Sequence, residues 1–356
     1  MTRTLLLSAS LLNRYLSCPK QAAFSLEPQL KNYNKTTPSA ALGSVVHKVL
    51  ELSARNPVNW DESTLMDWFE KKWMELLFVE YENMQNEWKP NHVLNPYSWR
   101  GLYKAKAAAR TLVTKNSGIR PSRTAIVESF SFAERSEGEV SFPFVEKYLV
   151  DPVLRIHGKL DYVTLEDGKA TIIDYKFGRD QLFLDAHKLQ MHFYVILLES
   201  VTKFPVEKCV IVTSANREQE LPIDRVYIAF LLEEFSRVLK ALETRKVLAY
   251  PSNDNCQFCA FKIKCTNFRN SNLRTPSGHP LIISGIILQV SKMDNKYQEV
   301  LVHQGDGLSA TDFRIFRVPF EYPLEIGKKI HVYGNLYFHS GFLVEFQWNS
   351  TLEVEA

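Results

Sequence analysis

The sequence lacks any apolar run near 18 residues, so we expect no transmembrane helix and no membrane partner. Its start, Met-Thr-Arg-Thr-Leu-Leu-Leu-Ser, holds too short an apolar stretch for a signal peptide. The motif Gly-x4-Gly-Lys-Ser/Thr is missing, which excludes a P-loop helicase motor within these 356 residues. The formal net charge of +3 is too small to argue for any class of partner.

Cysteine is scarce, and its count of five is odd. In a long chain without a signal peptide, this count argues against a disulfide framework and for a reducing compartment in which thiolates bind a metal or a cluster. We therefore expect a cytoplasmic location. The remaining composition, 45% apolar and 23% charged, is ordinary for a soluble globular protein of one large or two ordinary domains.

The most informative stretch is a pair of β-type runs on either side of Asp167-Gly168. This dipeptide is favoured in the two-residue type I′ turn of a β-hairpin. If these two residues form the loop, Glu166 faces Lys169. Counting back along both strands then places Asp161 directly opposite Asp174, with Cβ atoms about 4.5–5.5 Å apart.

Two carboxylates at that separation repel each other. A hard divalent cation between Asp161 and Asp174 would remove the repulsion, because Mg²⁺ prefers oxygen ligands and usually binds one or two carboxylates plus water and phosphate. Lys176 lies two residues beyond Asp174 and so on the same strand face. It would stabilise charge on a phosphate or orient an attacking water. The alternative is a surface hairpin with scattered charges.

Two short motifs of this hairpin, Gly158-x-x-Asp161 and Ile173-Asp174-Tyr175-Lys176, resemble the core of the PD-(D/E)XK nuclease superfamily. More narrowly, they resemble its RecB-like branch, which includes the CRISPR-associated RecB-type nucleases and the AddB-type subunits. The resemblance covers roughly residues 6–268. It implies an α/β, restriction-endonuclease-like core in which helices flank a central mixed sheet, with DNA as substrate and Mg²⁺ or Mn²⁺ as cofactor.

Two further metal ligands follow from this resemblance. His47 ends the motif Gly43-x-x-x-His47 in a stretch with helical apolar spacing. A lone histidine there is more often a packed or surface residue, but the family has a metal ligand at this place. Glu128 interrupts a predicted strand, residues 124–132, that precedes the hairpin. An acid at a strand edge is usually solvated, whereas the resemblance implies that Glu128 supports the metal site.

Gln190 and Tyr194 lie four residues apart on one face of the helix predicted after the hairpin. Gln-x-x-x-Tyr after Asp-x-Lys is a mark of the RecB-like branch, which implies that both residues line the DNA path beside the metal. The alternative is an exposed glutamine and a core tyrosine.

Four cysteines form a second signal, the triplet Cys256-x2-Cys259-x5-Cys265 and the distant Cys18. Four thiolates bind either zinc or an iron–sulfur cluster. Zinc usually takes two close pairs, and the arrangement found here resembles the [4Fe–4S] cluster of the CRISPR-associated and AddB-type nucleases. We favour the cluster over zinc. It would link the two ends of the nuclease domain.

Beyond a linker at residues 271–278, the pattern changes to strands with little helix. Five strands are predicted, at residues 281–290, 297–303, 313–318, 329–339 and 342–348. They look like an OB-fold, a five-stranded barrel that often binds single strands through aromatic and basic side chains. The candidates for such contacts are Phe313, Arg314, Phe316, Arg317, Tyr333 and Tyr337. From residue 277 on, the sequence contains six Lys/Arg and nine Asp/Glu, so this part is acidic. A protein partner therefore suits the barrel as well as DNA does.

The sequence thus predicts a RecB-like nuclease domain with a cluster-bearing helical part at residues 1–270 and a small all-β barrel at 279–356. The first functional hypothesis is a metal-dependent DNA nuclease in repair, CRISPR adaptation or phage defence. It would be an exonuclease or end-processing enzyme that prefers single strands. The second is a non-cleaving DNA-binding or scaffold subunit of a helicase–nuclease complex. Expected partners are single-stranded DNA or DNA ends, and a helicase or other protein.

Overall fold

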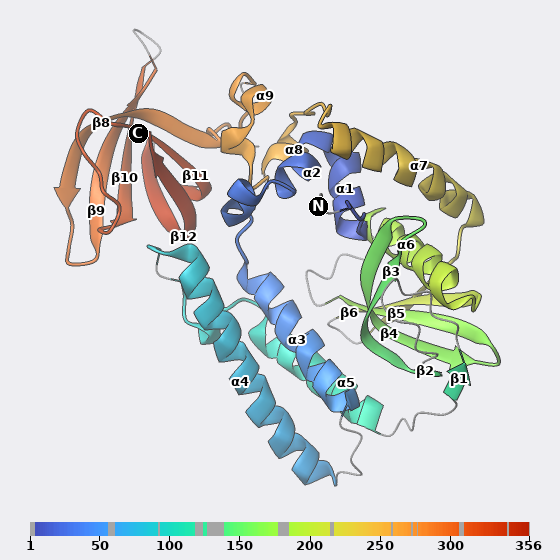
Figure 1. The fold of residues 1–356 in the computed structure, drawn as a ribbon. Helices are drawn as coiled ribbons and strands as arrows, with labels where there is room; N and C mark the ends of the chain where they lie inside the picture. The colour runs from blue at the N-terminus through green and yellow to red at the C-terminus, as the bar shows by residue number, and fades with distance from the viewer. Residues whose placement is uncertain are drawn as a thin grey trace. The chain divides into compact units, whose positions relative to one another are not determined.

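The computed structural model describes residues 4–55, 61–91, 93–117, 124–126, 139–176, 185–213, 217–257, 259–271, 273–275, 277–305, 310–339 and 342–355. The chain folds as two compact units (Figure 1). One unit comprises residues 1–16, 37–80 and 96–247, and the other comprises residues 17–36, 81–95 and 248–356. In the part of the chain that the structure describes, no helix is long and apolar enough to cross a membrane.

The first unit is built on a five-stranded mixed sheet of order β3-β4-β5-β6-β7. Only β5 and β6 are parallel, because α6 (Asp185–Thr202) carries the chain across between them. The other neighbours are antiparallel. These elements are β3 (Phe144–Asp151), β4 (Ile156–Glu166), β5 (Lys169–Lys176), β6 (Val206–Thr213) and β7 (Glu218–Leu221). The predicted central mixed sheet is confirmed.

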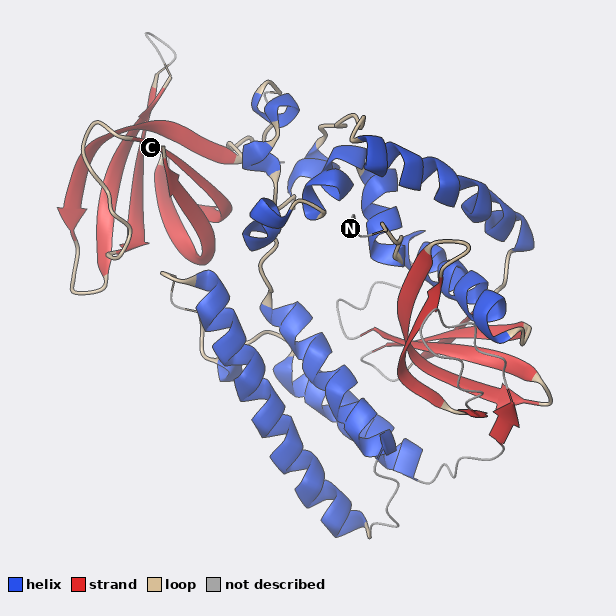
Figure 2. Ribbon diagram, in the orientation of Figure 1, coloured by secondary structure: helices blue, strands red, loops and turns tan. Residues whose placement is uncertain are grey.

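Helices flank this sheet (Figure 2). Helix α6 packs on it where β4 has Gly158, since a Cβ there would lie 3.0 Å from Cε1 of Tyr194 and 3.1 Å from a methyl of Leu197. Helix α7 (Arg225–Thr244) packs on α6 through Phe235 and Phe193, whose ring centroids are 5.3 Å apart. The glycine therefore sets the distance between sheet and helix.

A second group of helices holds α3 (Pro38–Arg55) in place. Its buried face, including Val45, Val46 and Val49, contacts α5 (Leu102–Ser117), which buries Ala105 and Ala109. Small alanines allow the two helices to lie close together, and Figure 1 shows them side by side. The remaining helices and short strands are α1 (Ala9–Ser17), α4 (Glu62–Trp88), η2 (Pro96–Ser98), β1 (Thr124–Ile126) and β2 (Glu139–Ser141).

The hairpin between β4 and β5 has the predicted turn and register. Asp167 and Gly168 both have positive φ, 48° and 77°, as a type I′ turn requires. Glu166 pairs with Lys169, and the regular pairing continues to Tyr162 and Ile173. Asp161 and Asp174 occupy the next positions beyond that pairing.

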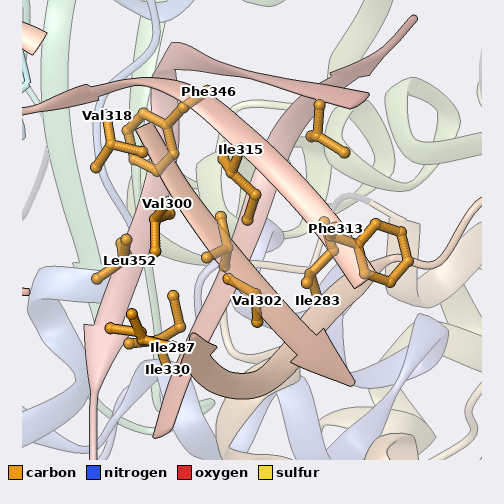
Figure 3. Packing of buried hydrophobic residues seen from close by; sticks show 12 residues of the cluster. Ile283, Ile287, Val300, Val302, Phe313, Ile315, Val318, Ile330, Phe346 and Leu352 are labelled. Carbon is orange, nitrogen blue, oxygen red and sulfur yellow. The ribbon is translucent and has the colours of Figure 1, made fainter. Parts of the chain in front are cut away.

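The second unit contains a closed barrel in the order β10-β12-β11-β8-β9. Its strands are β8 (Ile282–Lys292), β9 (Tyr297–Gln304), β10 (Thr311–Pro319), β11 (Lys329–Phe338) and β12 (Leu343–Val354). Alternating residues of each strand fill the interior (Figure 3). Phe313 is one of them, 4% exposed, and Tyr333 is 5% exposed, so the prediction that these two rings contact a partner was wrong.

Short helices complete the second unit. They are α2 (Pro19–Ser25), η1 (Pro28–Tyr33), α8 (Asn253–Gln257), η3 (Lys262–Lys264) and α9 (Thr266–Arg269). Segments far apart in sequence meet here: Lys20 N donates to Leu248 O at 3.0 Å, and Asn255 Nδ2 donates to Ser17 O at 3.0 Å. The N-terminal helix α2 is therefore held against the cysteine-rich segment.

The turn of the hairpin allows a test of the fold. Replacing Gly168 by Ala should lower the free energy of unfolding by about 1–2 kcal/mol, because an L-residue resists positive φ. A Cβ at this position meets no atom within 4 Å, so the cost is backbone strain alone. Urea denaturation measures it.

The matched control is Gly43→Ala, in helix α3, where a Cβ also meets nothing within 4 Å and φ is not positive. This variant should be stabilised by about 1 kcal/mol, since alanine favours helix over glycine. A Gly168→Ala protein as stable as the unmodified one would contradict the assigned turn.

Candidate metal and catalytic site

Three ligand atoms from three different elements converge in the first unit. His47 comes from α3, Glu146 from β3 and Asp161 from β4, and one ligand atom of each lies within 4.8 Å of the other two. His47 Nδ1 is 2.8 Å from Glu146 Oε1 and 3.5 Å from Asp161 Oδ1. An imidazole nitrogen and two carboxylates suit a divalent cation.

Asp174 lies at the end of β5 and is only 1% exposed. Its Oδ2 is 2.6 Å from Lys176 Nζ, and its Oδ1 accepts a hydrogen bond of 3.3 Å from Gln190 Nε2. Gln190 Nε2 also donates to Tyr194 OH at 2.9 Å. The glutamine is therefore engaged at the site, and the tyrosine, although buried, contacts it through its hydroxyl.

Asp161 connects these two groups. Its Oδ2 accepts a hydrogen bond of 2.8 Å from Tyr175 N, the residue between Asp174 and Lys176. The carboxylate thus reaches across to β5 at the point where the regular pairing of the hairpin has ended. The hairpin places both aspartates in one site, as its register predicted.

The electrostatics follow from burying several acids together. Burial raises the pKa of Asp161 to about 7, and the charge of Asp174 raises it too, against the opposing effects of His47, Lys176 and Tyr175 N–H. Burial lowers the pKa of His47, but the hydrogen bond to Glu146 and the charges of Asp161, Glu146 and Asp174 outweigh it, so this pKa is raised. The surrounding acids thus favour the protonated form of His47.

One buried oxygen shows that the residues fit a cation. Asp174 Oδ2 is buried and has no hydrogen-bond partner among the described residues, because Lys176 Nζ approaches it closely but outside hydrogen-bond geometry. A buried carboxylate oxygen without a donor is costly. A hard divalent cation bound beside Asp161 would satisfy this oxygen and remove the repulsion between the two aspartates.

The sequence interpretation missed Glu146. Burial raises its pKa, but hydrogen bonds from His47 and Lys159 outweigh this and lower it, so it stays ionised. Val145 pairs with Tyr162 and Lys147 pairs with Leu160, which places Glu146 opposite Asp161. This register involves two strands joined by no short turn motif, so the sequence carries no local signal for it. Glu128, predicted for a similar role, lies outside the described residues.

The chain is similar to known proteins over most of its length. Residues 6–266 match the family model described as the PD-(D/E)XK nuclease superfamily. No curated protein matches the chain. A solved structure, "Crystal structure of SSO0001", is 17% identical and covers 53% of this chain and 80% of its own, with a TM-score of 0.25.

The raised pKa of Asp161 predicts how stability depends on pH. Its ordinary value of 3.8 rises to about 7 in the folded protein. Its contribution to stability is therefore full below the ordinary value and is lost as the pH rises through about 7. In EDTA, the free energy of unfolding should fall over this range by up to about 1.4 kcal/mol per pH unit.

Asp161→Asn should lose this slope, because the amide does not titrate yet still accepts from Tyr175 N. At pH 8 in EDTA the variant should therefore be more stable than the unmodified protein. Denaturation curves between pH 4 and 8 measure the difference. Parallel pH profiles for the two proteins would refute the assigned environment of Asp161.

Proposed function

The chain belongs to the PD-(D/E)XK nuclease superfamily, and from this premise we propose that it is a deoxyribonuclease of the RecB-like type that uses Mg²⁺ or Mn²⁺. Membership implies a metal-dependent nuclease in general. The observation that carries the specific proposal is the convergence of Asp161, Asp174 and Lys176 in one site, together with His47.

We assign the metal to His47, Glu146, Asp161 and Asp174. When bound there, a divalent cation would lower the pKa of a bound water and neutralise the scissile phosphate. Asp174 holds the Lys176 ammonium at 2.6 Å, so the lysine is placed to orient the attacking water or to stabilise the negative charge that develops on the phosphate. Gln190 holds Asp174 through Oδ1 and would contact the strand together with Tyr194.

The proposed pathway roles are repair, CRISPR adaptation or phage defence, with action on single strands or DNA ends and with a separate helicase or other protein as partner. A non-cleaving scaffold subunit is the less favoured alternative. Such a subunit would gain nothing from burying Asp161 beside Asp174, an arrangement that raises the pKa of Asp161 and leaves an oxygen without a donor.

Replacing Asp174 by Asn or Lys176 by Met should abolish cleavage, with a loss of at least about a hundredfold, since each removes a charge needed in the transition state. The assay is release of fragments from labelled single- and double-stranded DNA with Mg²⁺, Mn²⁺ or EDTA. Lys169→Met is the control, because this exposed lysine of the same strand pairs only with Glu207 in the described residues. Full activity in either site variant would overturn the assignment.

We also propose that Cys18, Cys256, Cys259 and Cys265 hold a [4Fe–4S] cluster. All four line one pocket of the second unit. Their spacing in the sequence, one distant cysteine and a tight triplet rather than two close pairs, supports a cluster over zinc.

The chemistry of the same pocket supports an anionic centre. Lys262 is only 4% exposed, and its Nζ donates to Gln257 O at 2.9 Å, with no described carboxylate within 4.0 Å. A buried ammonium calls for a negative partner, which four thiolates would supply. Burial raises the pKa of the Cys259 thiol to about 11, so its thiolate form requires a bound cation. The expected cytoplasm would keep these thiols reduced.

Replacing Cys256 by Ser should remove most of the iron and sulfide from the purified protein and bleach its broad visible absorption. Cys209→Ser is the matched control, because Cys209 is buried in β6 and lines no part of the pocket. Iron, acid-labile sulfide and zinc per chain are the measurements. Colourless wild-type protein that contains zinc would reject the cluster.

We propose that the barrel is an OB-fold and that residues 271–278 divide it from the nuclease domain at residues 1–270. The strand order and the parallel pairing of β10 with β12 support this fold. A β-bulge between Ile315 and Val318, with Arg317 at φ 63°, leaves Phe316 and Arg317 both accessible to solvent. With Arg314 and Tyr337 they remain the candidates for contact with single-stranded DNA or a protein.

A further inference from the structure

Two cavities of the first unit share Lys159 of β4, and they differ in charge. One, of about 650 Å³, contains His47 and the acids Glu51, Glu80, Glu146 and Asp161. The other, of about 550 Å³, contains Lys176, Gln190 and Tyr194, and none of its described lining residues is acidic. The first cavity thus suits a cation, and the second suits a polyanion.

The second cavity extends along β4 from the catalytic residues to His157. Asp161 lies four positions after His157 in the strand, a separation of about 13 Å. The remaining wall includes the first turn of α1. The cavity therefore lies beside the proposed metal ligands, where the substrate strand would continue from the scissile bond.

At its far end stands an aromatic ring in a fixed orientation. Tyr148 of β3 is 55% exposed, yet its hydroxyl forms a hydrogen bond of 2.7 Å with His157 Nδ1. The two rings are 5.5 Å apart and tilted by 51°. Burial lowers the pKa of His157, which favours the neutral imidazole. An exposed ring anchored by its polar end is suited to stacking.

We propose that this second cavity binds an unpaired nucleotide of the substrate strand next to the scissile bond. Tyr148 supplies the stacking face, and His157 is a positioning residue that holds the ring. Lys159 and Lys176 face the phosphates. The proposal deepens the nuclease function and rests on it. An unpaired base is required because stacking on a side chain needs a free base face, and a cavity of about 550 Å³ accommodates a nucleotide-sized ligand.

The test measures binding of the full-length protein to a labelled oligothymidylate and to a blunt duplex, in EDTA so that no cleavage occurs. Tyr148→Thr removes the ring and keeps a residue that suits a strand. It should weaken oligothymidylate binding about five- to a hundredfold, the effect of losing one stacked base. Duplex binding should change less than about twofold. In Mg²⁺, KM for the oligothymidylate should rise while kcat stays nearly unchanged.

Three companion variants sharpen the result. Tyr148→Phe keeps the ring and should retain most of the affinity. His157→Ala frees the ring and should give an intermediate loss. Tyr103→Ala is the control, because Tyr103 of α5 is 76% exposed and lines neither cavity, and it should behave as wild type.

The outcomes separate this inference from the nuclease proposal. If the wild type cleaves DNA and Tyr148→Thr binds oligothymidylate as tightly as Tyr103→Ala does, the inference is wrong and the nuclease assignment stands. An equal loss for duplex and single strand overturns the claim that the base is unpaired. A wild-type protein that neither binds nor cleaves DNA overturns both.

Discussion

The burial of Asp161 next to Asp174 is the constraint on which the site depends. Asp174 is 1% exposed and the side chain of Asp161 12%, and their mutual repulsion is relieved by the nearby cations His47 and Lys176 and by hydrogen bonds from Tyr175 N and Gln190 Nε2. Lys176 lies on the same strand as Asp174, whereas His47 lies on helix α3, more than 100 residues earlier in the chain. The packing of α3 on α5 therefore forms part of the core and also holds His47 beside the acids. Burial is the main reason why the pKa of Asp161 rises, and the charge of Asp174 adds to it.

Strand β4 separates two chemical environments. On one side, Glu146 contacts both His47 and Lys159 in a cavity that also holds Asp161. A divalent cation entering this group would compete with the imidazolium for Glu146 and Asp161. Lys159 lines both this acidic cavity and the acid-free cavity that contains Lys176.

The sequence was informative where local rules determine the structure. Asp167-Gly168 defines its own turn, and the turn defines the register that brings Asp161 to Asp174. Gln190 and Tyr194 follow from helical spacing. Glu146 could not be found in this way, because its place beside Asp161 depends on how β3 pairs with β4, and its φ of 51° departs from regular strand geometry.

In the barrel, too, the sequence did not show which side chains point inward. Strand β10 buries Phe313 by regular alternation, but a bulge between Ile315 and Val318 breaks that alternation. Tyr333 is buried for a different reason. Its hydroxyl donates to Glu353 at 2.8 Å, and Lys264 Nζ reaches the same carboxylate at 3.1 Å. Lys264 lies immediately before Cys265, so the cysteine-rich segment and the barrel share a polar contact within the second unit. Bringing Cys18 next to the three later cysteines closes a segment of more than 200 residues, which costs conformational entropy. A centre bound by all four cysteines would offset that cost. The four thiols that would bind the cluster would therefore also hold in place the segment that contacts the barrel through Lys264.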